Sequence, residues 1–318
     1  MKVQRTARVA IATAAAFGLA AGGVVAPASA ASRATVVIVT SNALTGLNPS
    51  VSGFNLTFNT SVAYLQGMGF NYYDNKPALI DNKVFGTYKV VSQKPFRVKY
   101  TVNPGRVWSD GTPITGVDLL LSHVLASSSY SAVAGLGDPK DANTTPAFNS
   151  GGYGGTYDEH SVGLPQLSSD KMSVTIEYDA AIPDWQINGP GPAPVHTLVL
   201  LAEGKKGLQS AAVNSAARAK FEKAFFAYDK TLLAKIGKVW SNDYNINKVD
   251  GNTNPLLLVS NGAYLVQGAV PNSSVTLMLN PKYNSGPKTS GIKTIIYKVI
   301  GDGTAAAQAL ANKEVDVY

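Results

Sequence analysis

The stretch of residues 103–118, NPGRVWSDGTPITGVD, constrains the fold more than any other part of the sequence. Asp110-Gly111 predicts a tight turn, because glycine adopts the positive φ that such corners often need. Thr115 is placed as a helix N-cap, and Asp118 follows three residues later as an acidic variant of the capping box. Trp108 puts a large apolar side chain just ahead of the turn. The stretch therefore predicts a strand end, a polar turn and a capped helix, whose apolar face comprises Val117, Leu120, Leu121, Val124 and Leu125.

Residues 1–30 have the three parts of a secretory signal. Lys2, Arg5 and Arg8 supply the positive start, residues 9–25 an apolar run, and Ala28-Ser29-Ala30 a small-residue cleavage site. The alternative is a membrane anchor, but the run is rich in Ala and Gly and is followed by Pro27, which is weak for a span. We therefore expect export and removal of this segment.

The rest of the composition indicates a folded protein. With 45% apolar and 15% charged residues, the 318-residue chain can bury a substantial core in one or two domains. Without the three basic residues of the leader, 24 basic residues face 20 acidic ones, and they form no basic run, so we expect no nucleic-acid partner. The sequence has no cysteine, which excludes disulfides, thiolate chemistry and a lipid anchor attached through cysteine.

Periodicity and turn residues place the remaining elements. The β-branched residues 35–40 predict a strand buried on both faces, and alternation predicts an antiparallel pair with one wet face at 88–91 and 96–102. Residues 127–163, rich in Gly, Ser, Asn and Pro, predict a surface excursion. Further strands are expected at 171–178, 260–266 (a turn followed by a strand), 274–279, 291–300 and 314–318, and the second and third of these form a hairpin around a turn at Pro271-Asn272. Helices are expected at 59–70 (ending at Gly67 or Gly69), within 211–240 (the second capped by Asp229) and at 304–312. The helices within 211–240 carry a core stripe of apolar residues: Phe221, Phe225, Tyr228, Leu232 and Ile236.

Several of these segments together resemble one family. Trp108-Ser-Asp-Gly-Thr-Pro-Ile-Thr115 with Asp118, Leu47-Asn-Pro49, Gly262-Ala-Tyr264, Asn280-Pro-Lys-Tyr283 and the strand–helix–Glu314 segment follow in the order found in the oligopeptide/dipeptide-binding, or family 5, extracytoplasmic solute-binding proteins. These serve ATP-binding-cassette importers. The resemblance implies an α/β fold of the two-lobed type II periplasmic-binding-protein class with mixed sheets.

The resemblance also implies a division of the chain. We expect lobe I to span 31–283, with a core of 31–62 and 180–283 and an excursion subdomain of 63–179. Residues 284–318 would form the hinge and the start of lobe II. On this division the first lobe is present and the second is truncated, so we expect the sequence to be the N-terminal portion of a longer protein.

The predicted site residues form two groups. Ser41, Asn42 and Ala43 follow a strand end, where ligands dock on parallel sheets, although a plain turn explains them equally well. Tyr130 and Tyr283 are ligand contacts implied by the resemblance, and for Tyr130 an exposed loop position is the alternative. A structural group holds the corner: Trp108, Asp110, Gly111, Thr115 and Asp118.

No reactive constellation emerges from the sequence. His123, His160 and His196 lack the spacing of a zinc helix, and a nucleophile-elbow serine motif is missing. The one Ser-x-x-Lys run, Ser168 to Lys171, leads into an alternating strand rather than a helix. We therefore predict a protein that is not an enzyme and uses no metal or other cofactor.

The predicted function is capture of a short peptide or similar small solute outside the cytoplasmic membrane. The expected partner is the membrane permease of an ATP-binding-cassette importer, and we expect a monomer in the periplasm or cell envelope. A binding protein outside transport (a signal-peptide receptor, chaperone or metal-chelate carrier) is the main alternative, and an exported hydrolase is a weaker one.

Overall fold

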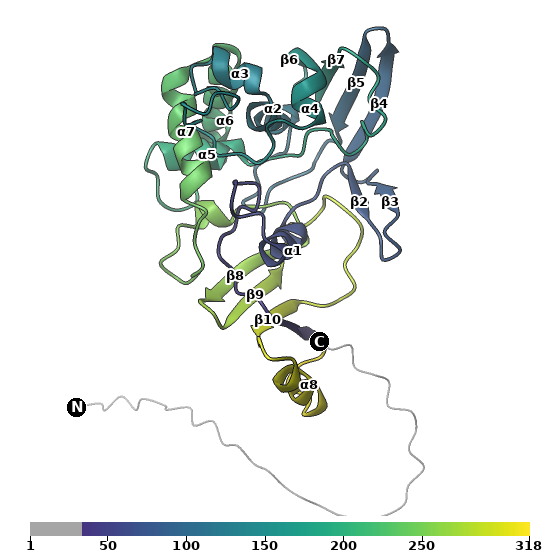
Figure 1. Ribbon diagram of the computed structural model, residues 1–318, viewed down its shortest axis with the longest axis vertical. Coiled ribbons are helices and arrows are strands. Elements are labelled where there is room, and N and C mark those ends of the chain that lie inside the picture. The colour runs from purple at the N-terminus through teal and green to yellow at the C-terminus, as the bar shows by residue number, and fades with distance from the viewer. Residues whose placement is uncertain (1–33) are drawn as a thin grey trace, which may run out of the picture. The chain divides into compact units, whose positions relative to one another are not determined.

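A computed structural model describes residues 34–318, and the predicted signal peptide, residues 1–30, lies outside them. Helices and strands are mixed along the chain (Figure 1). The strands are β1 (Thr35–Thr40), β2 (Asn71–Tyr73), β3 (Leu79–Asp81), β4 (Gly86–Gln93), β5 (Phe96–Val102), β6 (Ser161–Leu167), β7 (Ser173–Tyr178), β8 (Tyr264–Val270), β9 (Ser274–Leu279) and β10 (Thr294–Val299). The helices are α1 (Thr57–Gln66), α2 (Leu120–Ala126), α3 (Ser128–Val133), α4 (Thr156–His160), α5 (Val195–Ala202), α6 (Ala211–Phe226), α7 (Lys230–Asn242) and α8 (Gly303–Ala311), with 3-10 turns η1 (Gly116–Leu119) and η2 (Pro255–Leu258).

One mixed sheet has the strand order β1-β10-β9-β8. β1 runs parallel to β10, and β10, β9 and β8 pair antiparallel, with the predicted hairpin turn between β8 and β9. The strand at 35–40 is confirmed, but the prediction that both its faces are buried is wrong. Its residues from Val36 onward are only half-buried, because Val36 and Ile38 pack at the edge of the core cluster rather than inside it.

The predicted strand–helix–strand crossover is confirmed in its first strand and its helix, whereas residues 314–318, predicted as the second strand, form only an isolated bridge. β10 leads into α8, capped by Asp302, and the chain then returns so that Val317 bridges Ile38 in parallel. β1 therefore has β10 on one edge and the segment around Val317 on the other. β10, expected to begin the second lobe, lies between β1 and β9. The division of the chain into lobes stays a prediction.

A second sheet, fully antiparallel, has the order β4-β5-β7-β6. β5 shows the predicted alternation, with Phe96, Val98, Tyr100 and Val102 buried and the residues between them half-buried. That regular alternation is what a sheet with one core face and one wet face requires. β2 and β3 form a separate small ribbon.

The helices α5, α6 and α7 pack beside the second sheet around the larger core. Phe221, Phe225 and Ile236 of the predicted apolar stripe are fully buried, and Asp229 caps α7 by accepting the Leu232 N–H at 3.1 Å. The helix predicted at 59–70 is α1, and of its two predicted ends, Gly67 and Gly69, the structure has the first, because Gly67 already has an extended backbone.

The region 127–163, predicted as a surface excursion, contains more regular structure than its composition indicates: α3, α4 and the start of β6. Asp158 explains the order: its carboxylate accepts the backbone N–H of Ser128 at 2.7 Å and that of Gly154 at 2.9 Å. This carboxylate holds together segments that carry weak helix signals of their own.

Tyr130 shows the consequence of that order. The expectation of an exposed loop tyrosine is wrong, because Tyr130 lies in α3 and is 3% exposed. Its ring stacks on Phe225 with centroids 4.9 Å apart, and its hydroxyl donates to the Phe225 carbonyl at 2.8 Å.

Candidate functional site

The Asp110 corner forms as a tight turn. Gly111 has φ +93°, the left-handed conformation that the sequence predicts there. Asp110 Oδ1 accepts the Thr112 N–H at 2.9 Å, and Asp110 Oδ2 accepts the Thr112 hydroxyl at 3.0 Å. These bonds close the turn locally.

Asp110 also joins the corner to two distant helices. Its Oδ2 lies 3.0 Å from Nε2 of His196 on α5 and accepts Nδ2 of Asn214 on α6 at 3.1 Å. The side chains of His196 and Asp110 are 0% and 2% exposed. Burial alone would raise the pKa of Asp110, but the bonds from His196 and Thr112 outweigh it and lower that pKa below its usual value.

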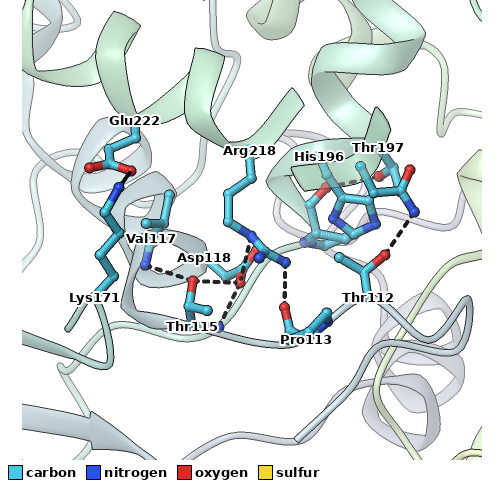
Figure 2. A network of polar contacts seen from close by, with 12 residues as sticks. Thr112, Pro113, Thr115, Val117, Asp118, Lys171, His196, Thr197, Arg218 and Glu222 are labelled. Atoms are coloured by element: carbon cyan, nitrogen blue, oxygen red, sulfur yellow. Dashed lines mark hydrogen bonds and ion pairs between the residues drawn. The ribbon is translucent and has the colours of Figure 1, made fainter. Parts of the chain in front are cut away.

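Asp118 forms a second buried junction, seen in Figure 2 between Thr115 and Arg218. The predicted capping box is present: the Thr115 hydroxyl accepts the Val117 N–H, and Asp118 Oδ2 accepts the Thr115 N–H at 2.8 Å. Arg218 on α6 places its Nε 3.5 Å from the same oxygen. Burial raises the pKa of Asp118, with Arg218 and Thr115 acting against it.

Together these contacts fix α5 and α6 against the corner. The side chains of Asp110, Asp118 and His196 are 2%, 0% and 0% exposed, so the network is suited to holding walls in place rather than to chemistry on a bound molecule. Trp108 lies at its edge, with its ring centroid 6.4 Å from that of His196. Trp108 is also part of the largely apolar cavity described next, so the network supports one wall of that cavity.

The cavity has a volume of about 490 Å³ and is bounded by segments far apart in sequence. Its walls come from the loop 47–50, α1, α2, the proline segment 191–194, the end of α7 and residues 257–261. Aromatic and aliphatic groups dominate: Leu47, Trp108, Leu121, Leu125, Leu198, Trp240, Tyr244, Leu257 and Val259. Such a mixture of apolar walls and a few polar groups is typical of small-molecule sites.

The polar groups of the wall are held in fixed positions. Asn261 donates to the Met68 carbonyl at 2.7 Å and accepts the Met68 N–H at 3.1 Å. Asn48 donates to the Trp240 carbonyl at 3.1 Å. Burial raises the pKa of Tyr244 to about 12, so its hydroxyl is neutral at physiological pH. The cavity is therefore a preformed and uncharged surface.

The predicted ligand residues lie outside this lining. Ser41 and Asn42 are exposed and Ala43 is half-buried beyond the end of β1, where the Thr40 carbonyl accepts the Ile300 N–H at 2.9 Å. Tyr283 is half-buried in the loop before β10, and burial raises its pKa to about 12. Tyr130 is in the helical core. The structure does not bring residues 41–43, Tyr130 and Tyr283 together in one site, and their ligand roles stay predictions.

Sequence reasoning misses most of the cavity. Trp240 is predicted only as the end of the helices within 211–240, Tyr244 has no predicted role, and Leu47-Asn48-Pro49 is used only as a family marker. Two features of the sequence could have pointed to the cavity. One is the pair of aromatic residues Trp240 and Tyr244 at the end of a helix, and the other is the proline series 190–194, which favours a fixed surface loop over regular structure. Neither feature shows that the helix end and the proline segment line the same cavity.

The three histidines lie apart. His123 contacts the Tyr157 hydroxyl at 2.8 Å, and burial lowers its pKa to about 4. His160 pairs with Asp179 at 2.9 Å on the surface. Within residues 34–318, no group of three His, Asp or Glu side chains is arranged to hold a metal ion. In the same range, none of the helices has the length and apolar character needed to span a bilayer.

Gly262 sets the distance between α1 and the start of β8, next to the cavity. A Cβ at this position would lie 2.4 Å from the Leu65 carbonyl oxygen and 2.2 Å from the Gln66 carbonyl carbon. We expect Gly262→Ala to lower the free energy of unfolding by about 1–3 kcal/mol, because backbone atoms of α1 must move. Urea unfolding measures this.

Gly251→Ala is the matched control for that substitution, because a Cβ added to Gly251 would have no atom within 4 Å of it. Its unfolding free energy should stay within about 0.5 kcal/mol of the wild type. Equal unfolding midpoints for the two variants would show that α1 does not rest on Gly262.

Comparison with known proteins gives three findings. Residues 75–318 match the family described as "Bacterial extracellular solute-binding proteins, family 5 Middle". No curated protein matches the chain. Similar solved structures include the periplasmic EDTA-binding protein EppA, with TM-score 0.61 and 20% identity over 88% of this chain and 42% of that one.

Two further structures are similar at the level of fold. The oligopeptide-binding protein AppA of Bacillus subtilis, in complex with a nonapeptide, has TM-score 0.56 and 14% identity over 88% of this chain and 43% of its own. The protein MoaA from A. tumefaciens R10, in complex with mannopinic acid, has TM-score 0.54 and 16% identity over 90% of this chain and 44% of its own. The chain thus spans less than half the length of each of these structures.

Proposed function

The chain belongs to family 5 of the bacterial extracellular solute-binding proteins, and from this premise we propose that it captures a short peptide for an importer. The family consists of binding proteins, and the mixed α/β fold of the type II periplasmic binding proteins, predicted from the sequence, is confirmed. The observation that carries the proposal is the preformed cavity of about 490 Å³.

The choice of a peptide is supported by the cavity and by the relatives. Similar structures hold ligands as different as a nonapeptide and mannopinic acid, so the fold alone does not select a solute. In this chain the lining combines apolar groups with amide and hydroxyl groups, among them Asn48, Ser122 and Asn261. That combination suits a ligand that itself carries both amides and apolar side chains.

The rest of the proposal follows from the family. The protein would be exported, bind its solute as a monomer, and pass it to the permease of an ATP-binding-cassette importer. Closure of two lobes on the ligand would then favour docking of the protein on the permease. Such closure is a population shift driven by the higher affinity of the closed form for the ligand.

Tryptophan fluorescence offers a direct test of peptide binding. The chain has three tryptophans, and Trp108 and Trp240 line the cavity. Trp185 packs against Tyr88, with ring centroids 5.5 Å apart, so Trp185→Phe leaves a signal from the cavity alone. We expect peptides of two to five residues to change the fluorescence of this variant in a saturable way.

Calorimetry on the unchanged chain is the companion measurement, since it does not depend on where the tryptophans lie. Saturable heats that rank the peptides in the same order of affinity as the fluorescence titration would support peptide capture. If millimolar peptide gave neither a heat nor a fluorescence change, peptide capture by this chain would be wrong.

A further inference from the structure

A second hollow continues the cavity. It has a volume of about 570 Å³ and is lined by residues 49–53, Asn55, Thr60, the end of α2 and residues 150–152. The two hollows share Pro49, Ser50, Ser122 and Leu125, so they adjoin at the loop 49–50. Together they form one groove, to which residues 259–261 contribute only in the cavity and the loop 150–152 only in the second hollow.

The groove carries no charge. The cavity has 22 lining residues and the second hollow 13, and four are shared, which leaves 31 different residues. Charged residues make up 15% of the chain, so about five of the 31 would be charged at the average frequency, and more on a typical surface. Among the described residues that line the groove there is no Asp, Glu, Lys, Arg or His.

The polar side-chain groups of the groove are amides, hydroxyls and the indole N–H groups of its tryptophans. Trp108 Nε1 and Ser260 Oγ, both on residues lining the cavity, are buried and have no hydrogen-bond partner among the described residues. An indole N–H can only donate, so a ligand that suits it offers an acceptor such as an amide carbonyl. A charged group in this groove would lose its hydration without gaining an ion pair.

We propose that the groove binds the uncharged, apolar interior of a peptide and excludes charged side chains, whereas the charged ends of the peptide lie outside it. This inference rests on the proposed function and adds a substrate class to it. Selectivity here comes from the penalty on charge rather than from one specific contact. A peptide with apolar side chains and carbonyl acceptors is the matching ligand.

A set of blocked peptides tests the charge penalty. The reference probe is N-acetyl-Ala-Phe-Ala-amide, and the comparison probes replace the central Phe by Lys, by Asp or by Leu. We expect the Phe and Leu peptides to bind the chain at least tenfold more tightly than the Lys and Asp peptides in calorimetry. Equal affinities, or tighter binding of either charged peptide, would overturn the inference while leaving peptide capture intact.

A charge placed in the groove tests whether the groove is where charged side chains are excluded. Gln66 lines the cavity from the end of α1, and Gln66→Glu adds a charge with almost no change in shape. We expect Gln66→Glu to weaken binding of the Phe peptide at least threefold and to reduce the difference in affinity between the Phe and Lys peptides. Gln93→Glu, the same change on the exposed end of β4, should leave both affinities unchanged.

The outcomes separate the two claims. If no peptide binds, the proposed function fails and this inference fails with it. If peptides bind with the expected preference but Gln66→Glu behaves like Gln93→Glu, the groove is not the site of discrimination and the inference is wrong. Thermal unfolding of both variants checks that any loss of binding is not a loss of folded protein.

Discussion

Asp110→Ala is expected to lower the free energy of unfolding by about 3–5 kcal/mol, because it removes one partner of a buried, hydrogen-bonded pair. The carboxylate accepts bonds from Thr112, His196 and Asn214, and its side chain is 2% exposed. Without it, His196 Nε2 on α5 is left buried and unpaired, and Asn214 Nδ2 on α6 keeps only its bond to the Thr112 hydroxyl at 2.8 Å. Urea unfolding followed by circular dichroism gives the change.

Asp110→Asn is the matched variant, since it keeps the shape and one acceptor oxygen while removing the charge. The folded pKa of Asp110 is lowered, so the stability it contributes is present above the ordinary carboxyl value and is lost as pH falls through the folded pKa. The difference in unfolding free energy between wild type and Asp110→Asn should be constant at neutral pH and shrink below about pH 4. A difference independent of pH would mean that the charge contributes nothing.

Asp118→Ala is expected to lower the free energy of unfolding by a similar amount, about 3–5 kcal/mol. The side chain of Asp118 is 0% exposed, and its loss leaves the Arg218 guanidinium, 12% exposed, without its carboxylate. It also removes the acceptor for the Thr115 N–H at the start of the helix. Chemical unfolding at pH 7 measures both effects together.

Two controls separate these effects. Asp302 is an exposed N-cap that accepts the Ala305 N–H at 2.7 Å, so Asp302→Ala should cost about 1 kcal/mol, the effect of a cap alone. Asp118→Leu combined with Arg218→Met removes the whole pair and should be less damaging than Asp118→Leu alone. If the double variant were less stable than Asp118→Leu alone, an unpaired Arg218 could not be the cause of the lost stability.

Local signals in the sequence predict much of the fold. The capping box of Thr115 and Asp118, the Asp229 cap and the β8–β9 hairpin each depend on residues a few positions apart, whose geometry the backbone fixes directly. The alternation in β5 similarly reports which face is buried. These features require no knowledge of distant parts of the chain.

The site depends on contacts that local signals do not encode. Asp110 is predicted as a turn residue, but its partners His196 and Asn214 lie 86 and 104 residues further on. α3 is missed because its order comes from Asp158, 30 residues after Ser128. The cavity likewise arises where a loop near Asn48 meets the end of α7, and composition at either place predicts only a surface.

The position of β1 has a consequence for the order in which the protein can fold. Both neighbours of this strand, β10 and the segment around Val317, are synthesised long after it, and Val37 donates to an Asp316 oxygen 279 residues away. Closing so long a loop is slow, and helices with local contacts form first. We therefore expect the mixed sheet to close last during folding, leaving the Val-Val-Ile-Val strand open to incorrect pairing until residues 294–317 are available.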